Sequence, residues 1–187
     1  NTHDYLMCFT NHGRCHWIKV YKLPEGGCNS RGRPINNVIQ LDENEKVSAI
    51  LPVRDFPEDE YVFFATTMGI VKKVQLSAFK NVSKVGIKAI ALKEGDSLVG
   101  VARTSGRNDI MLFSNLGKAI RFNEYWERSS DDEETGDDND TEISGSQEDD
   151  NAESAPISGK HGVRPSGRGS GGLRGMRLPE NGRIVSL

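Results

Sequence analysis

The sequence lacks several features that define common classes of protein. It has no run of eighteen apolar residues and no signal peptide, which favours a soluble cytoplasmic protein over a membrane-spanning or secreted one. It has only three cysteines and no CxxC pair, which fits a reducing compartment. No loop carries two carboxylates, or a Ser, His and Asp set, in a catalytic arrangement. We therefore expect no catalytic residue, no cofactor and no bound metal in this chain.

A short apolar run that ends in glycine occurs three times. The glycines are Gly13, Gly69 and Gly117, which lie 56 and 48 residues apart, and the three runs align without a gap. The later part of the unit recurs as well, because residues 86–101 align without a gap on residues 172–187. A period of about fifty residues, with four short strands in each unit, is typical of a propeller blade.

The repeat and its turn residues predict an all-β fold. Short runs rich in Val, Ile, Phe, Tyr and Leu alternate with turns, and no window keeps the spacing of an amphipathic helix for three turns. We predict a propeller-like array of three four-stranded blades, at residues 1–55, 56–105 and 106–187. Because Leu187 falls at the repeat position of Val101, we expect a piece of a longer array. Its open edge would be covered by further blades, a partner or a second copy.

Acidic residues gather in one window, residues 129–155. This window holds twelve of the 27 acidic residues and no basic one, and its composition predicts a disordered insertion within the third blade. The rest of the chain has 15 acidic against 24 basic residues. Two interpretations stay open. The insertion is a passive solvated loop, or its negative charges compete with a nucleic acid for the basic loop beside it.

Basic residues recur in phase with the repeat, at two points of the unit. One is the turn after the opening strand, with Arg14, Lys72, Lys73, Lys118 and Arg121. The other is a glycine-bearing loop, with Arg31, Arg33, Lys84, Lys88, Lys160, Arg164, Arg168, Arg174 and Arg177. Equivalent positions in a stacked array lie along one rim, so these charges predict a track for a polyanion such as nucleic acid. Glycines let backbone N–H groups and guanidinium groups approach phosphate together. The alternative is that these side chains only solubilise exposed loops.

The first 28 residues contain all three cysteines and three of the four histidines, which invites a zinc site. The repeat argues against it, because Cys8 is equivalent to Phe64 and Cys15 is equivalent to Val71, both apolar. We predict that both cysteines are reduced and buried in the core. Trp17 lies within a strand and is expected to pack rather than to stack on a nucleic-acid base.

With these residues in view, the chain resembles the C-terminal domain of DNA gyrase A and its sister domain in topoisomerase IV. The strings that carry the resemblance are KVYKLPE at residues 19–25, RGRPINN at 31–37, DIMLFSNLGKAIRF at 109–122 and GLRGMRLPENGRIVSL at 172–187. Two departures stand out. The heptapeptide QRRGGKG, the gyrase box of this family, is absent, and the acidic insertion is not part of the common pattern.

The resemblance implies a β-pinwheel, a spiral or ring of blades that bends duplex DNA around its basic outer edge. It implies a non-catalytic DNA-binding and wrapping module of a bacterial ATP-dependent type II topoisomerase, with cleavage and ATP hydrolysis elsewhere. The implied partners are double-stranded DNA, gyrase B and the rest of gyrase A, and the basic residues named above become the implied DNA contacts. The competing interpretation is a propeller-type scaffold for protein interactions, with the acidic segment as a recruiting loop.

Overall fold

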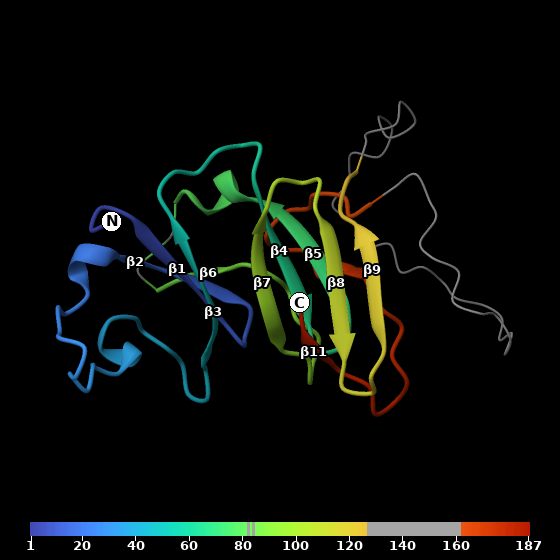
Figure 1. The fold of residues 1–187 in the computed structure, drawn as a ribbon, viewed down its shortest axis with the longest axis horizontal. Helices are drawn as coiled ribbons and strands as arrows, with labels where there is room; N and C mark the ends of the chain where they lie inside the picture. The colour runs from blue at the N-terminus through green and yellow to red at the C-terminus, as the bar shows by residue number, and fades with distance from the viewer. Residues whose placement is uncertain (82, 84, 127–161) are drawn as a thin grey trace, which may run out of the picture.

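The computed structural model describes residues 1–81, 83, 85–126 and 162–187 (Figure 1). Within these ranges the regular elements are β-strands and three short 3₁₀ helices, η1 (Val20–Lys22), η2 (Ile35–Asn37) and η3 (Leu76–Phe79). The predicted all-β fold is therefore confirmed. The acidic window at 129–155, together with Lys84 and Lys160, lies outside the described residues. None of the described helices is long and apolar enough to cross a membrane.

The strands form three antiparallel sheets. The first has the order β3 (Val47–Val53), β1 (Tyr5–Thr10), β2 (Arg14–Lys19) and β6 (Ile87–Lys88). The second has the order β7 (Leu98–Thr104), β4 (Tyr61–Thr66), β5 (Ile70–Gln75) and β10 (Leu173–Arg174). The third has the order β11 (Ile184–Ser186), β8 (Asp109–Ser114) and β9 (Ala119–Asn123).

In the first two sheets, one edge strand comes from the following repeat unit. β6 pairs with β2 of the first unit, although it follows β5 in sequence, and β10 pairs with β5 although it follows β9. The first two sheets have the four strands predicted for a blade, whereas the described part of the third has three. The blade boundaries stay a prediction. β6, from residues 56–105, completes the sheet of residues 1–55, and β10, from residues 106–187, completes the sheet of residues 56–105.

The repeated glycine closes each β-hairpin. Gly13, Gly69 and Gly117 have φ values of 74°, 80° and 73°, in the left-handed region that only glycine adopts without strain. At each turn, the backbone N–H of the residue after the glycine donates a hydrogen bond. The acceptor is the side-chain hydroxyl of the residue three positions before the glycine. These hydrogen bonds are Arg14 to Thr10 at 3.2 Å, Ile70 to Thr66 at 3.2 Å and Lys118 to Ser114 at 3.1 Å. The sequence period thus fixes where each sheet turns.

Apolar side chains fill the spaces between successive sheets. Phe9 of β1 meets Phe64 of β4 edge-on, with ring centroids 5.4 Å apart, and both are fully buried. Cys8 and Cys15 are buried and reduced, as predicted, and burial raises the pKa of Cys8 to about 11. Trp17 is half-buried and stacks on Phe56 with ring centroids 5.3 Å apart, which confirms that it packs against the core.

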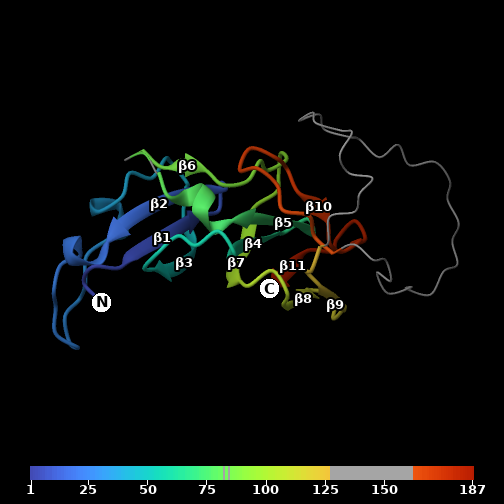
Figure 2. The same cartoon turned by 90° about the horizontal axis from the view of Figure 1, so that it is seen from above.

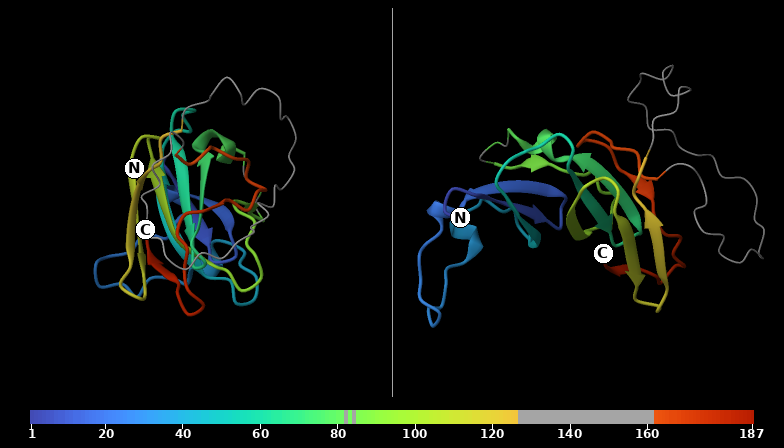
Figure 3. Two further views of the ribbon diagram at one scale, coloured as in Figure 1. Left: turned by 90° about the vertical axis from the view of Figure 1, so that its right-hand side faces the viewer. Right: turned by 45° about the horizontal axis from the view of Figure 1, so that its top comes forward.

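The sheets follow one another along a curve (Figure 3). The outer strands β6 and β10 lie on one side of this curve, and β3 and β7 lie on the opposite side (Figure 2). The strand exchange therefore makes a short segment of one basic loop, β6, the edge of the first sheet. A short segment of the next basic loop, β10, forms the edge of the second sheet. This side of the molecule therefore carries the two outer strands together with the basic loops that contain them.

Candidate nucleic-acid interface

The outer strands carry one exposed cation each, at equivalent places. Lys88 on β6 lies opposite Arg14 in the first sheet, and Arg174 on β10 lies opposite Ile70 in the second. Both side chains belong to exposed residues. Because Arg14 and Ile70 each directly follow the turn glycine, the two cations occupy the same register position on consecutive sheets. Two of the predicted contacts thus recur in phase on one side of the fold.

The loop that leads to β10 adds further cations beside Arg174. Its backbone is held by the N–H of Ser166, which donates to Lys73 O at 2.9 Å, and by the N–H of Ala91, which donates to Ser170 O at 3.1 Å. Around this frame lie three more predicted contacts, of which Arg168 is half-buried while Arg164 and Arg177 are exposed. The structure therefore concentrates positive charge where the second sheet ends.

Tyr125 and Trp126 lie next to this loop. The Arg164 guanidinium lies 5.5 Å from the centre of the Trp126 ring, and that of Arg107 lies 5.7 Å from the centre of the Tyr125 ring. Both rings line a surface cavity of about 730 Å³ that also carries the carboxylates of Asp59 and Glu60. Arg107 was not among the predicted contacts, because its position in the turn after β7 falls outside both basic clusters.

Four predicted contacts lie on other elements. Arg31 and Arg33 are exposed in the loop between η1 and η2. Lys118 lies at the β8–β9 turn and Arg121 lies on β9, and both are exposed. Arg121 approaches Asp109 only to 3.9 Å, with both side chains more than half exposed, so this ion pair leaves the cation accessible. Their contact with a nucleic acid stays a prediction.

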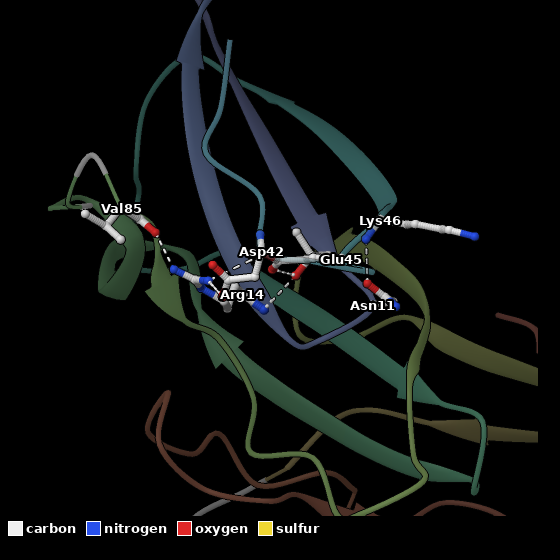
Figure 4. A network of polar contacts seen from close by, with 7 residues as sticks. Asn11, Arg14, Asp42, Glu45, Lys46 and Val85 are labelled. Atoms are coloured by element: carbon white, nitrogen blue, oxygen red, sulfur yellow. Dashed lines mark hydrogen bonds and ion pairs between the residues drawn. The ribbon is translucent and has the colours of Figure 1, made fainter. Parts of the chain in front are cut away.

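The Arg14 side chain has a structural role, and its guanidinium is bound by other groups of the protein. Its guanidinium pairs with Asp42 and Glu45 and donates from Nη2 to Val85 O at 2.6 Å (Figure 4). Glu45 in turn accepts the hydroxyl of Thr10 at 2.6 Å and the N–H of Asp42 at 2.9 Å. Burial alone would raise the pKa of Glu45, but these hydrogen bonds and the Arg14 charge outweigh it and lower that pKa. The charge of Arg14 is therefore already compensated within the protein.

Lys72 and Lys73 were predicted as surface contacts, and the structure corrects this. Only 1% of Lys72 and 2% of Lys73 is exposed. The Lys72 ammonium donates to three backbone carbonyls, and the Lys73 ammonium donates to Glu124 O at 2.6 Å. Burial lowers the pKa of both, to about 8 for Lys72. Lys72 and Lys73 are both buried because β5 packs on both of its faces, and adjacent side chains of a strand point to opposite faces.

A family model described as "DNA gyrase C-terminal domain, beta-propeller" matches residues 4–54, 60–105, 108–125 and 161–187. Over its whole length the chain is 77% identical to DNA gyrase A of Neisseria gonorrhoeae and 47% identical to that of Aeromonas salmonicida. It spans 21% and 22% of those relatives.

Two solved structures are similar to this chain. A C-terminal domain of DNA topoisomerase IV has a TM-score of 0.73 and 29% identity, covering 100% of this chain and 47% of that one. A DNA gyrase A C-terminal domain has a TM-score of 0.64 and 23% identity, covering 99% of this chain and 47% of that one, a likeness that concerns the fold alone.

Proposed function

Because the chain belongs to the family of DNA gyrase C-terminal domains, we propose that it is a non-catalytic module that binds and bends duplex DNA. The observation that supports this most directly is the recurrence of an exposed cation, Lys88 and then Arg174, on the outer strand of consecutive sheets. Duplex DNA presents phosphates at regular intervals, so cations repeated in register suit its backbone rather than its bases. The curve of the sheets would bend the duplex that follows them.

The proposed contacts fall into two groups. The central group lies on β6, on β10 and in the adjoining loop, and comprises Lys88, Arg164, Arg168, Arg174 and Arg177. The outlying group comprises Arg31, Arg33, Lys118 and Arg121. Arg14, Lys72 and Lys73 are removed from the contact set because each is engaged by protein atoms. The excess of basic residues outside the acidic window adds a general attraction to polyanions.

The chain spans about a fifth of the length of the curated relatives that it matches. In a protein of that length, we propose that this module would present a DNA segment to a breakage domain and so support negative supercoiling. Strand cleavage and ATP hydrolysis would belong to other regions and to gyrase B, in the bacterial cytoplasm where the chromosome lies. Membership of the gyrase family does not favour the alternative of a protein-interaction scaffold.

The proposal predicts steep salt dependence of DNA binding. The logarithm of the association constant of the chain for a duplex should fall linearly with the logarithm of salt, with a slope that corresponds to roughly five to ten phosphates. Fluorescence anisotropy with a labelled duplex, repeated with a second duplex of unrelated sequence, measures both slope and specificity. A response that is flat in salt, or strong preference for one duplex, would contradict the proposal.

The acidic insertion has a test of its own. If its twelve negative charges compete with DNA, deleting residues 129–155 should tighten binding to a short duplex at low salt. The difference should shrink as salt rises, because screening weakens both attractions. Equal affinities of the intact and deleted chains at low salt would identify the insertion as a passive loop. Weaker binding after deletion would mean that the insertion organises the basic loop.

A further inference from the structure

Lys72 joins two segments that carry proposed DNA contacts. From the middle of β5 its ammonium donates to Ala89 O at 3.2 Å, Arg168 O at 2.8 Å and Ser170 O at 2.7 Å. Ala89 directly follows β6, whose exposed cation is Lys88. Arg168 and Ser170 lie in the loop that leads to β10. One buried charge therefore ties together the outer segments of consecutive sheets.

The hydrogen-bonding capacity of Lys72 is completely used. A lysine ammonium has three donors, and here each meets a backbone carbonyl while the residue is 1% exposed. Burying an ammonium without such partners is costly, so the surrounding backbone has to stay where it is to satisfy the charge. A second link reinforces the same junction, since the N–H of Ala91 also donates to Ser170 O at 3.1 Å. The loop is thus fixed from the inside, away from any ligand.

The first unit holds its neighbouring loop in a related way. There Arg14 of β2 donates from Nη2 to Val85 O at 2.6 Å, just before β6 (Figure 4). In both sheets a basic side chain from the second strand of the hairpin reaches a backbone carbonyl of a basic loop from the following unit. The basic residues after the turn therefore act as anchors, and the loops that they hold carry the exposed charges.

We propose that Lys72 is a positioning residue for DNA binding, which fixes the separation between the cations of β6 and those of the loop and strand around β10. The inference rests on the proposed DNA-binding function. Since Lys72 is buried, it acts through the backbone of Arg168 and Ser170 and touches no phosphate itself. Its loss should weaken binding without removing a contact to DNA.

The protonation of Lys72 gives the inference a distinctive signature. Burial, together with the charge of Lys88 on β6, lowers the pKa of Lys72 to about 8. Burial raises the pKa of the Cys15 thiol on β2, and the charge of Arg168 in the loop opposes this rise. At pH 7 Lys72 therefore has three donors, and well above its pKa it has two. DNA affinity should fall as the pH rises through this range.

This fall cannot come from a loss of stability caused by Lys72. The pKa of Lys72 is lower in the folded state than in the unfolded state. At a pH between these two values, the unfolded state therefore binds more protons than the folded state. The stability contribution of Lys72 then increases as the pH rises from about 8 towards its ordinary pKa. Affinity and stability should thus move in opposite directions, which a merely structural role would not produce.

The experiment measures duplex binding by the full chain at pH 7, 8 and 9 and at several salt concentrations. Wild type should lose roughly three- to tenfold in affinity between pH 7 and pH 9. Lys72→Met should bind roughly tenfold more weakly at pH 7, with the salt slope of wild type and no pH step. Lys88→Met, a contact variant, should lower the salt slope by about one and move the pH step upward, because Lys88 no longer depresses the pKa of Lys72.

The outcomes separate the inference from the function on which it rests. A wild-type chain that binds no duplex overturns both. A wild-type chain that binds with a steep salt slope but shows no step near pH 8, or a Lys72→Met chain that matches wild type at every pH, overturns the positioning role alone. If Lys72→Met does not fold, as judged by circular dichroism, the wild-type pH profile and its shift in Lys88→Met decide the question.

Discussion

Reversing the charges of Lys88 and Arg174 together should weaken duplex binding by about 100-fold or more at moderate salt. Each of these exposed side chains can form a charge-assisted hydrogen bond to phosphate, and such a bond contributes roughly 1.5–3 kcal/mol. Glutamate at both positions removes two contacts and adds repulsion from the same phosphates. The salt slope should fall by about two. Anisotropy titrations of the Lys88→Glu, Arg174→Glu double variant measure both quantities.

A matched control reverses two cations that lie away from the outer strands. Lys22 in η1 and Lys46, just before β3, are exposed, and the side chain of neither pairs with an acid in the described part of the chain. Lys22→Glu with Lys46→Glu changes the net charge by the same amount, so a similar loss of affinity would show that only total charge matters. The melting temperature of both double variants should stay near that of wild type, because none of these side chains is buried.

The turns of this fold were predictable from the sequence, and the exchange of strands was not. Gly13, Gly69 and Gly117 recur because a left-handed turn requires glycine, which is a local demand that a local pattern records. β6 and β10 contain only two residues each, and their partners lie in the preceding unit. Nothing in a two-residue run specifies which distant strand edge it will join, so the assembly of the first two sheets from two units each had to come from the structure.

The candidate interface was predictable in part for a similar reason. The loop cations follow from composition and phase, since Lys88 and Arg174 are basic residues at equivalent positions of the repeat, and the structure leaves both exposed. The cations of β5 were misassigned because charge usually signals exposure. The acceptors that stabilise Lys72 come from residues 17, 96 and 98 positions away, and no local pattern shows that these carbonyls converge. One clue to the burial of Lys72 and Lys73 was available. The two residues are adjacent in a strand, so their side chains point to opposite faces, and the strand they pair with, Tyr61–Thr66, is almost wholly apolar.

Replacing Gly69 by alanine should destabilise the fold by about 3 kcal/mol or more. Its φ of 80° costs any other residue roughly 1–2 kcal/mol. In addition, a Cβ atom there would lie 2.6 Å from the carbonyl oxygen of Met176, which is backbone and cannot swing aside. The Gly69 carbonyl accepts the N–H of Gly175 at 2.8 Å and that of Met176 at 3.2 Å, so the displaced backbone would also strain the link between the second sheet and the end of β10.

The same substitution at Gly117 isolates the contact between units. Gly117 has a φ of 73° and the same place in its hairpin, but a Cβ atom there would meet nothing within 4 Å. Gly117→Ala should therefore cost only the backbone term, about 1–2 kcal/mol, whereas Gly69→Ala should cost clearly more. Urea denaturation of both variants gives the two free energies of unfolding. Equal losses would mean that the carbonyl of Met176 moves away freely. The pairing of β10, from the third unit, with the second sheet would then contribute little to the stability of the array.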